Sequence, residues 1–260
     1  MGELKNIIQV QDFSFAYEER LVLKNITLEL KPSCFHVILG QNGSGKSTLL
    51  RSMAGMLPVQ KQKIFIASHD ITEMPLKTRA KTFGLLSQKH KAVFPFSVED
   101  VVMTGRAAFI SFVPKEKDRL IVHQTLEKTG ILHLKDRCYT ELSGGEQQLA
   151  MIARVLAQQA PLLFLDEPTT HLDFYNQEKV LSLIKNLTQE GLSVVAVLHD
   201  PSMAFLFGDH FIFLKNGRLV NVPEGKMPWD ADFLENIYEM KLEAIPHAKR
   251  ALIVPSNSGK

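Results

Sequence analysis

The residues with the clearest chemical meaning form the run Gly40-Gln41-Asn42-Gly43-Ser44-Gly45-Lys46-Ser47, which fits the spacing G-x-x-x-x-G-K-[ST]. Three glycines let the backbone turn tightly and aim its N–H groups at an anion. Lys46 adds a positive charge, and the Ser47 hydroxyl is a ligand that Mg²⁺ accepts beside a phosphate. The pattern predicts a phosphate-binding loop.

The segments on either side of this loop support the same interpretation. Residues 34–39 are almost all apolar and predict a buried strand, whereas residues 47–54 predict a helix. A strand, a glycine loop and a helix in this order place an anionic phosphate at a helix N-terminus. A glycine turn without any ligand is the alternative, and the flanking elements disfavour it.

Two neighbouring carboxylates, Asp166 and Glu167, follow the apolar run at residues 162–165. A buried parallel strand with this ending would place both carboxylates at the carboxyl edge of the sheet, beside the loop. We expect Asp166 to hold Mg²⁺ together with Ser47, and Glu167 to polarise an attacking water as a general base. An exposed acidic turn is the alternative interpretation.

A third motif is the segment Leu142-Ser143-Gly144-Gly145-Glu146. As local structure it predicts a helix start, in which Ser143 is the N-cap and Glu146 completes a capping box. Adjacent glycines and a serine at a helix N-terminus also form a site for an anion. The chain would then carry two surfaces that are directed at phosphate.

Together these motifs resemble the ATP-binding subunit of an ATP-binding cassette (ABC) transporter, in the order of that family. The resemblance makes the loop a Walker A motif, the Leu142 segment the family signature, and the acidic pair a Walker B motif. It implies Tyr17 as the aromatic residue that stacks on adenine, and Gln88 as the glutamine that contacts Mg²⁺ and senses a membrane partner. It also implies His199 as the switch histidine that meets the γ-phosphate, and residues 170–173 as a loop that crosses the dimer interface.

The resemblance assigns a role to each matching residue. The catalytic residues would be Lys46, Glu167 and His199, and the Mg²⁺ ligands Ser47, Gln88 and Asp166. The residues that would bind ATP are Tyr17, Gly40, Gln41, Asn42, Gly43, Ser44, Gly45, Lys46, Ser47, Thr48, Gln88, Ser143, Gly144, Gly145, Glu146, Asp166 and Asp173.

The family's use of two anion sites implies a set of partners. Two copies dimerise head to tail, and Ser143 and Gly145 of one copy would contact the γ-phosphate of ATP bound on the other. The dimer would act with two copies of a membrane permease, and indirectly with an extracytoplasmic substrate-binding protein. The subunit would then lie peripherally at the cytoplasmic face of the inner (plasma) membrane.

The segment at residues 94–106 resembles the importers of metal chelates, of the iron-siderophore, haem and cobalamin type. This segment would dock a permease, although an amphipathic subdomain helix is also compatible with it. Two departures leave the cargo open. Ser87 stands where proline is common, and Leu149 stands where most relatives have a basic residue; apolar residues at this position also occur in molybdate or tungstate importers. An exporter subunit and an ABC ATPase without a transport role remain further alternatives.

Composition closes off other classes. The 260 residues include 30 basic and 28 acidic ones, and a net charge of +2 gives no electrostatic case for binding nucleic acid. No apolar run approaches the ~18 residues of a membrane helix, and the N-terminus lacks the apolar core of a signal peptide. We therefore expect a soluble, intracellular chain.

Apolar patterning predicts an α/β fold with a parallel sheet, an N-terminal antiparallel β subdomain and an inserted α-helical subdomain. The resemblance implies that the parallel sheet belongs to a P-loop NTPase (RecA-like) core. Residues 1–222 would form the ATP-binding domain, with the helical part at about 90–160, and residues 223–260 a helical extension and tail. Strands are predicted within 6–39 and at 64–67, 83–86, 162–165, 194–198, 211–214 and 218–222, and helices at 47–57, from 98, and at 117–129, 144–159, 176–189 and 230–238.

Overall fold

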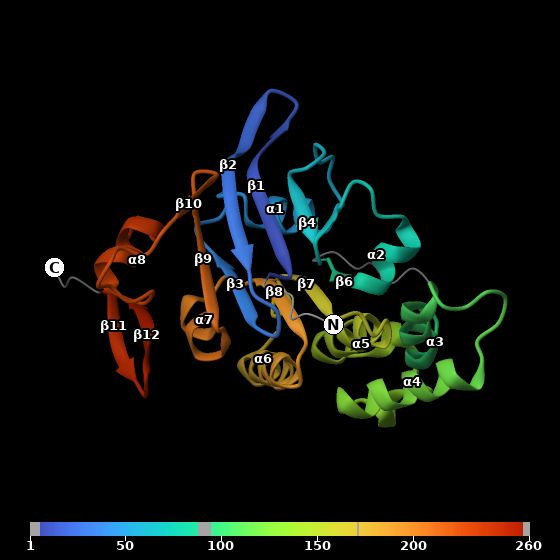
Figure 1. Cartoon of the computed structure of the whole chain (residues 1–260). Coiled ribbons are helices and arrows are strands. Elements are labelled where there is room, and N and C mark those ends of the chain that lie inside the picture. The colour runs from blue at the N-terminus through green and yellow to red at the C-terminus, as the bar shows by residue number, and fades with distance from the viewer. Residues whose placement is uncertain (1–5, 88–94, 171, 257–260) are drawn as a thin grey trace.

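A computed structural model describes residues 6–87, 95–170 and 172–256. Its centre is a six-stranded sheet with the strand order β10-β9-β3-β8-β7-β6 (Figure 1). Neighbouring strands run parallel, except that β10 is antiparallel to β9. The strands are β3 (Phe35–Leu39), β6 (Phe83–Leu86), β7 (Leu162–Asp166), β8 (Ser193–Val197), β9 (His210–Lys215) and β10 (Arg218–Val220).

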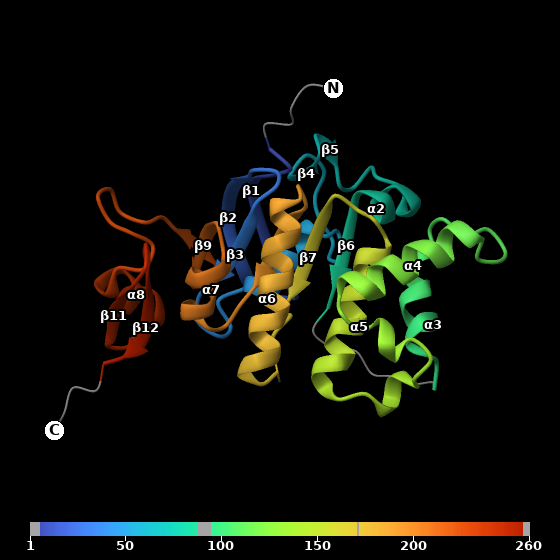
Figure 2. The same ribbon diagram turned by 90° about the horizontal axis from the view of Figure 1, so that it is seen from below.

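Every residue of β3, β7 and β8 is buried, as predicted for strands that are covered on both faces. Alternate residues of β7 face opposite cores: Leu163 packs with one apolar cluster and Phe164 with the other. Helix α1 (Lys46–Met53) packs on one face of the sheet (Figure 1), and α6 (Phe174–Gln189) and α7 (Pro201–Phe207) pack on the other (Figure 2).

The predicted N-terminal antiparallel sheet is confirmed. It has the strand order β2-β1-β4-β5, and a tight turn at residues 18–19 joins β1 to β2. Its apolar face packs against α1 and the central sheet. Its strand β2 is followed directly in the chain by β3, the strand before the glycine loop. Its strands are β1 (Ile8–Tyr17), β2 (Arg20–Leu30), β4 (Ile64–Ile66) and β5 (His69–Asp70).

The predicted helical insertion is also present. Ser97 is the N-cap of the helix at residues 98–103, and the Ser97 Oγ accepts from the Asp100 N–H at 3.1 Å. Gly130 adopts φ +71° just beyond the helix at residues 116–128. The helices between β5 and β7 are α2 (Leu76–Thr82), α3 (Val98–Met103), α4 (Glu116–Lys128) and α5 (Gly144–Ala157). In the described part of the chain, no helix is both long and apolar enough to cross a membrane.

The structure differs from the predictions in several elements: α2, α7 and β5 were not predicted, and the end of α1 and the C-terminal segment differ from what was expected. Helix α1 ends at Met53 rather than at residue 57, because Gly55 adopts φ +61° and turns the chain before Pro58 is reached. The segment predicted as a helical extension and tail contains α8 (Ala231–Tyr238), but it continues as an antiparallel pair, β11 (Leu242–His247) and β12 (Arg250–Pro255). This pair packs against α7, a tertiary contact that local patterning does not encode.

Candidate nucleotide-binding site

The glycine loop connects β3 to α1 and lies tightly against β9. Gly40 has φ +146°, and a Cβ there would lie 2.1 Å from the Leu214 carbonyl oxygen. Gly45 has φ +106°, and a Cβ there would approach the Leu23 side chain to 2.9 Å. Glycine at these two positions therefore allows both the backbone conformation and the close approach.

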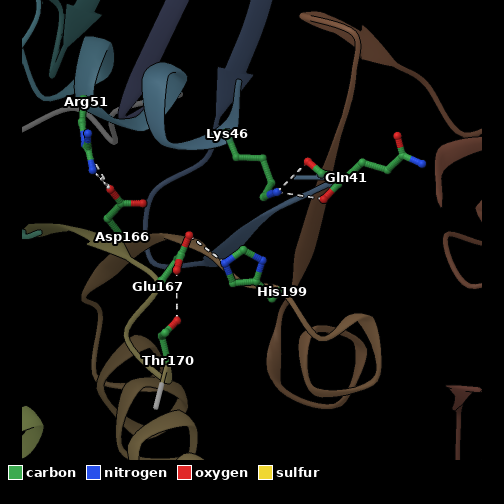
Figure 3. Close-up of polar contacts among 8 residues, drawn as sticks. Gln41, Lys46, Arg51, Asp166, Glu167, Thr170 and His199 are labelled. Atoms are coloured by element: carbon green, nitrogen blue, oxygen red, sulfur yellow. Dashed lines mark hydrogen bonds and ion pairs between the residues drawn. The ribbon is translucent and has the colours of Figure 1, made fainter. Parts of the chain in front are cut away.

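The side chain of Lys46 folds back onto this loop. Its buried ammonium donates hydrogen bonds to the carbonyls of Gly40 at 2.8 Å and Gln41 at 2.9 Å (Figure 3). Burial lowers the pKa of Lys46, and the carboxylates of Glu167 and Asp166 act in the opposite direction. The hydroxyl of Ser44 is buried and has no hydrogen-bond partner among the described residues. The loop thus holds a cation and an unsatisfied hydroxyl where an oxyanion would bind.

Asp166, at the end of β7, is 1% exposed and faces α1. Arg51 donates to its Oδ2 from Nε at 3.1 Å and from Nη2 at 2.8 Å (Figure 3). The other oxygen, Oδ1, is buried without a hydrogen-bond partner in the described part of the chain. Sequence reasoning missed Arg51, although a basic residue in the helix after a phosphate loop could have been paired with the Walker B aspartate.

Glu167 has φ +56°, a left-handed conformation that is uncommon for a non-glycine residue. This turn directs its carboxylate to two partners: Oε1 lies 2.7 Å from His199 Nε2, and Oε2 accepts from Thr170 Oγ1 at 3.0 Å (Figure 3). The structure therefore brings together Glu167 and His199, which lie on loops after two adjacent strands. The bond from Thr170 was not anticipated.

An open pocket of about 350 Å³ lies over the loop. It brings together the end of β1, the start of β2, the glycine loop, and the loops after β7 and β8. Tyr17 stands at this pocket with 45% of its surface exposed, whereas Arg20 and Val22 are lining residues that were not predicted. The lining consists of Tyr17, Arg20, Val22, Asn42, Gly43, Gly45, Lys46, Ser47, Thr48, Glu167 and His199.

Some predicted residues lie elsewhere. The side chain of Gln41 donates to the Tyr238 carbonyl at 2.6 Å, away from the pocket lining. Asp173 is the N-cap of α6, where Oδ1 accepts from the Asn176 N–H at 2.8 Å. Gln88 lies outside the described residues.

The signature segment forms the predicted capping box. The Ser143 N–H donates to Glu146 Oε2 at 2.8 Å, and the Glu146 N–H donates to Ser143 Oγ at 3.4 Å. The Ser143 hydroxyl also donates to Glu146 Oε2 at 2.7 Å, and this bond, together with the one from the Ser143 N–H, lowers the pKa of Glu146. A Cβ on Gly145 would lie 2.7 Å from the Asn176 amide, whereas a Cβ on Gly144 would meet open space. Ser143 and Gly144 are exposed and belong to none of the surfaces that line the pocket of their own chain.

The sequence of this chain matches the model of a known protein family. The family model described as ABC transporter matches residues 23–170, more than half of the chain. This chain belongs to the ABC transporter family. As a member it is the family's ATPase component, and its P-loop NTPase fold agrees with the predicted one.

Curated relatives of this ABC ATPase match over most of its length. The ferric enterobactin transport ATP-binding protein FepC of Escherichia coli (strain K12) is 34% identical, with 94% of this chain and 92% of FepC covered. The hemin import ATP-binding protein HmuV of Gloeobacter violaceus is 33% identical, with 92% and 90% covered. The ABC transporter ATP-binding protein YvrA of Bacillus subtilis (strain 168) is 36% identical, and this chain spans 55% of its length.

Solved structures resemble this ABC ATPase in the same way. A metal-chelate type ABC transporter in an inward-facing conformation matches with a TM-score of 0.83 and 28% identity, over 97% of this chain and 98% of that one. A dimeric bacterial ABC transporter cassette matches with a TM-score of 0.74 and 27% identity, over 82% and 97%.

Proposed function

We propose that this ABC ATPase hydrolyses ATP to power the import of a metal chelate through a partner permease. The observation that carries the ATPase part is one pocket that joins the Lys46 loop to the Glu167–His199 pair. The names of FepC and HmuV, and the metal-chelate type of the similar solved transporter, support the cargo class.

The loop would bind the phosphates of ATP. Its N–H groups and the Lys46 ammonium surround the β- and γ-phosphates, so Lys46 exchanges its bonds to loop carbonyls for bonds to phosphate oxygens. Tyr17, exposed at the pocket, would stack on the adenine ring. Arg20 lines the same pocket and is placed to contact the nucleotide.

Glu167 would act as the general base. The attacking water loses a proton to the Glu167 carboxylate while its oxygen bonds to the γ-phosphorus, and the bond from phosphorus to ADP breaks. The bonds from His199 and Thr170 fix the carboxylate, so no rotation is needed during the step. Lys46 neutralises charge that develops on the phosphoryl oxygens.

The residues present fit a Mg²⁺ ion. Asp166 presents a buried oxygen, Oδ1, without a hydrogen-bond partner among the described residues, and the Ser47 hydroxyl lies in the pocket. Oxygen ligands from one carboxylate and one hydroxyl leave room for phosphate oxygens and water, which suits this metal. When bound, Mg²⁺ supplies charge neutralisation at the phosphates.

Two copies of the chain and two copies of a permease would form the working unit, at the cytoplasmic face of the inner membrane. The dimeric cassette structure supports the ATPase dimer. Leu149, which left a molybdate or tungstate importer open, is 3% exposed and packs in the core. Packing alone therefore explains an apolar residue there, and Leu149 does not favour that alternative.

Two measurements test the proposal. Lys46→Ala should weaken ATP binding at least tenfold and abolish hydrolysis. Lys46 is the only charged residue of the loop at residues 40–47, so the substitution removes the positive charge that would contact the phosphates. Purification of the wild-type chain from detergent-solubilised native membranes should recover a permease, whose binding protein is then tested with a ferric siderophore, haem and molybdate. Recovery of the chain without any membrane protein would contradict the transport role.

A further inference from the structure

The C-terminal extension, residues 223–256, contacts both the Walker A loop and the helix that follows His199. We propose that this extension is a positioning element for catalysis, which holds both the Walker A loop and the helix that follows His199. The inference rests on the proposed nucleotide site, and its two contact points are independent of each other.

The extension is anchored firmly in the core. Leu234 and Ile237 of α8 are fully buried, and the ring of Phe233 meets Phe213 of β9 edge to face, with 4.8 Å between centroids. Lys215, two residues further along β9, forms an ion pair with Glu239 at 3.1 Å. A segment with these contacts can transmit a fixed position, which a frayed tail could not do.

The first contact is with the Walker A loop. Gln41 Nε2 donates to the Tyr238 main-chain carbonyl at 2.6 Å, and the main-chain carbonyl of Gln41 accepts from Lys46 Nζ at 2.9 Å. One residue therefore connects the end of α8 to the phosphate-binding lysine. The Tyr238 hydroxyl is buried, and burial raises its pKa; the Gly40 backbone lowers this pKa and the Asp200 carboxylate raises it.

The second contact is with α7, which begins two residues after His199. Ser202 Oγ donates to the Ile253 carbonyl at 2.9 Å and accepts from the Ile253 N–H at 2.7 Å. At the other end of α7, Arg250 Nη1 donates to the carbonyls of Gly208, at 2.7 Å, and Phe205. Strand β12 thus holds α7 at both ends.

These contacts matter because His199 must stay within hydrogen-bond reach of Glu167, a distance of 2.7 Å. The Ser202 N–H donates to Asp200 Oδ1 at 2.7 Å, so the start of α7 and the residue after His199 move together. If β12 releases α7, the His199–Glu167 geometry loosens and the chemical step slows. If α8 releases Gln41, the loop around Lys46 loosens and ATP binds less tightly.

The test separates these two effects in the full-length chain. Ser202→Ala should lower kcat about fivefold, the size of one lost hydrogen bond, and change KM for ATP less than twofold. Ser202→Thr keeps the hydroxyl and should restore kcat. Gln41→Ala should instead raise KM about fivefold. The matched control is Ser182→Ala. Among the described residues, the Ser182 hydroxyl donates only to Glu178 Oε1, at 2.6 Å, on the exposed face of α6 and away from the pocket lining.

Thermal unfolding of each variant is measured beside the kinetics, with assays well below the transition. Wild-type kcat and KM in both Ser202→Ala and Gln41→Ala would overturn the proposal, whatever their melting temperatures, since the contacts would then be structural only. Lys46→Ala distinguishes the two levels. If Lys46→Ala still hydrolyses ATP, the proposed nucleotide site itself is wrong; if it is inactive while the other variants are normal, only the positioning role fails.

Discussion

At the residue scale, the position of Glu167 depends on backbone strain. A left-handed φ at a non-glycine residue costs about 1–3 kcal/mol, and here it turns the carboxylate toward His199 and Thr170. The strain is offset by those two bonds and by the buried strand that precedes it. A general base that is held in this way needs little reorganisation when water attacks.

Glu167→Gln should therefore bind ATP as well as the wild type does but hydrolyse it at least about a hundredfold more slowly, because the amide cannot accept the proton. ATP binding is measured with a fluorescent analogue, and hydrolysis by phosphate release. Glu190→Gln is the control, since Glu190 pairs with Lys128 on the surface. Turnover near the wild-type rate would show that another group positions the water.

A second prediction at this scale concerns Arg51, the ion-pair partner of the buried Asp166. Arg51→Met leaves that carboxylate without its cation, so the free energy of unfolding should fall by about 2 kcal/mol, a value reduced because Arg51 is partly exposed. Lys61→Met, which breaks an exposed pair with Glu73, should change it by less than about 0.5 kcal/mol. Urea denaturation measures both, and equal losses would contradict the assignment.

At the element scale, β3 carries a titratable residue inside the core. His36 is 2% exposed, its Nε2 donates to the Lys31 carbonyl at 2.8 Å, and its ring stacks on His210 of β9 with 5.1 Å between centroids. Burial lowers the pKa of His36 to about 4; the neighbouring His210 lowers it further, and Asp209 and the Lys31 bond oppose the shift. The neutral ring thus suits a strand that is covered on both faces.

This shift has a consequence for stability. Between pH 6.5 and pH 4 the unfolded chain binds a proton that the folded chain does not, so stability is complete above pH 6.5 and falls as the pH drops. The His36 contribution is about 3 kcal/mol across that window. Urea denaturation at pH 7 and pH 4.5 should show a smaller difference for His36→Gln than for the wild type. An equal difference would mean that other groups cause it.

At the scale of the whole molecule, the signature segment and the pocket are separate surfaces of one chain. Ser143 and Gly144 are exposed at the N-terminus of α5, and Gly145 is required where α5 meets Asn176 of α6. An exposed helix start with its own capping box can still receive an anion from outside. This arrangement favours a site that two chains complete.

Ser143→Arg should leave ATP binding by the monomer within about twofold of the wild type and abolish hydrolysis, because the larger side chain blocks the second copy's nucleotide. Light scattering with ATP should show a monomer for this variant, and a dimer for Glu167→Gln. Ser182→Arg, an equivalent change on the exposed face of α6, is the control. Retained hydrolysis by Ser143→Arg would argue against a composite site.

The sequence alone determined the parts that local chemistry encodes. The glycine loop, the Walker B strand, the capping box of Ser143 and Glu146 and the longer helices follow from spacing, apolar runs and turn residues that act over a few positions. The roles expected for Lys46, Glu167 and His199 came from the motifs and the family resemblance, and the structure places all three at one pocket.

Only the tertiary structure decided which distant residues support that pocket. Arg51 meets Asp166, Gln41 turns to Tyr238, and β12 forms and packs on α7, because each contact joins segments that lie far apart in the chain. Their side chains carry no periodic or motif signal, since a lone arginine, glutamine or serine fits many surface positions equally well. Such contacts depend on how the helices and the C-terminal strands pack on the central sheet, and that packing is decided by the fold as a whole.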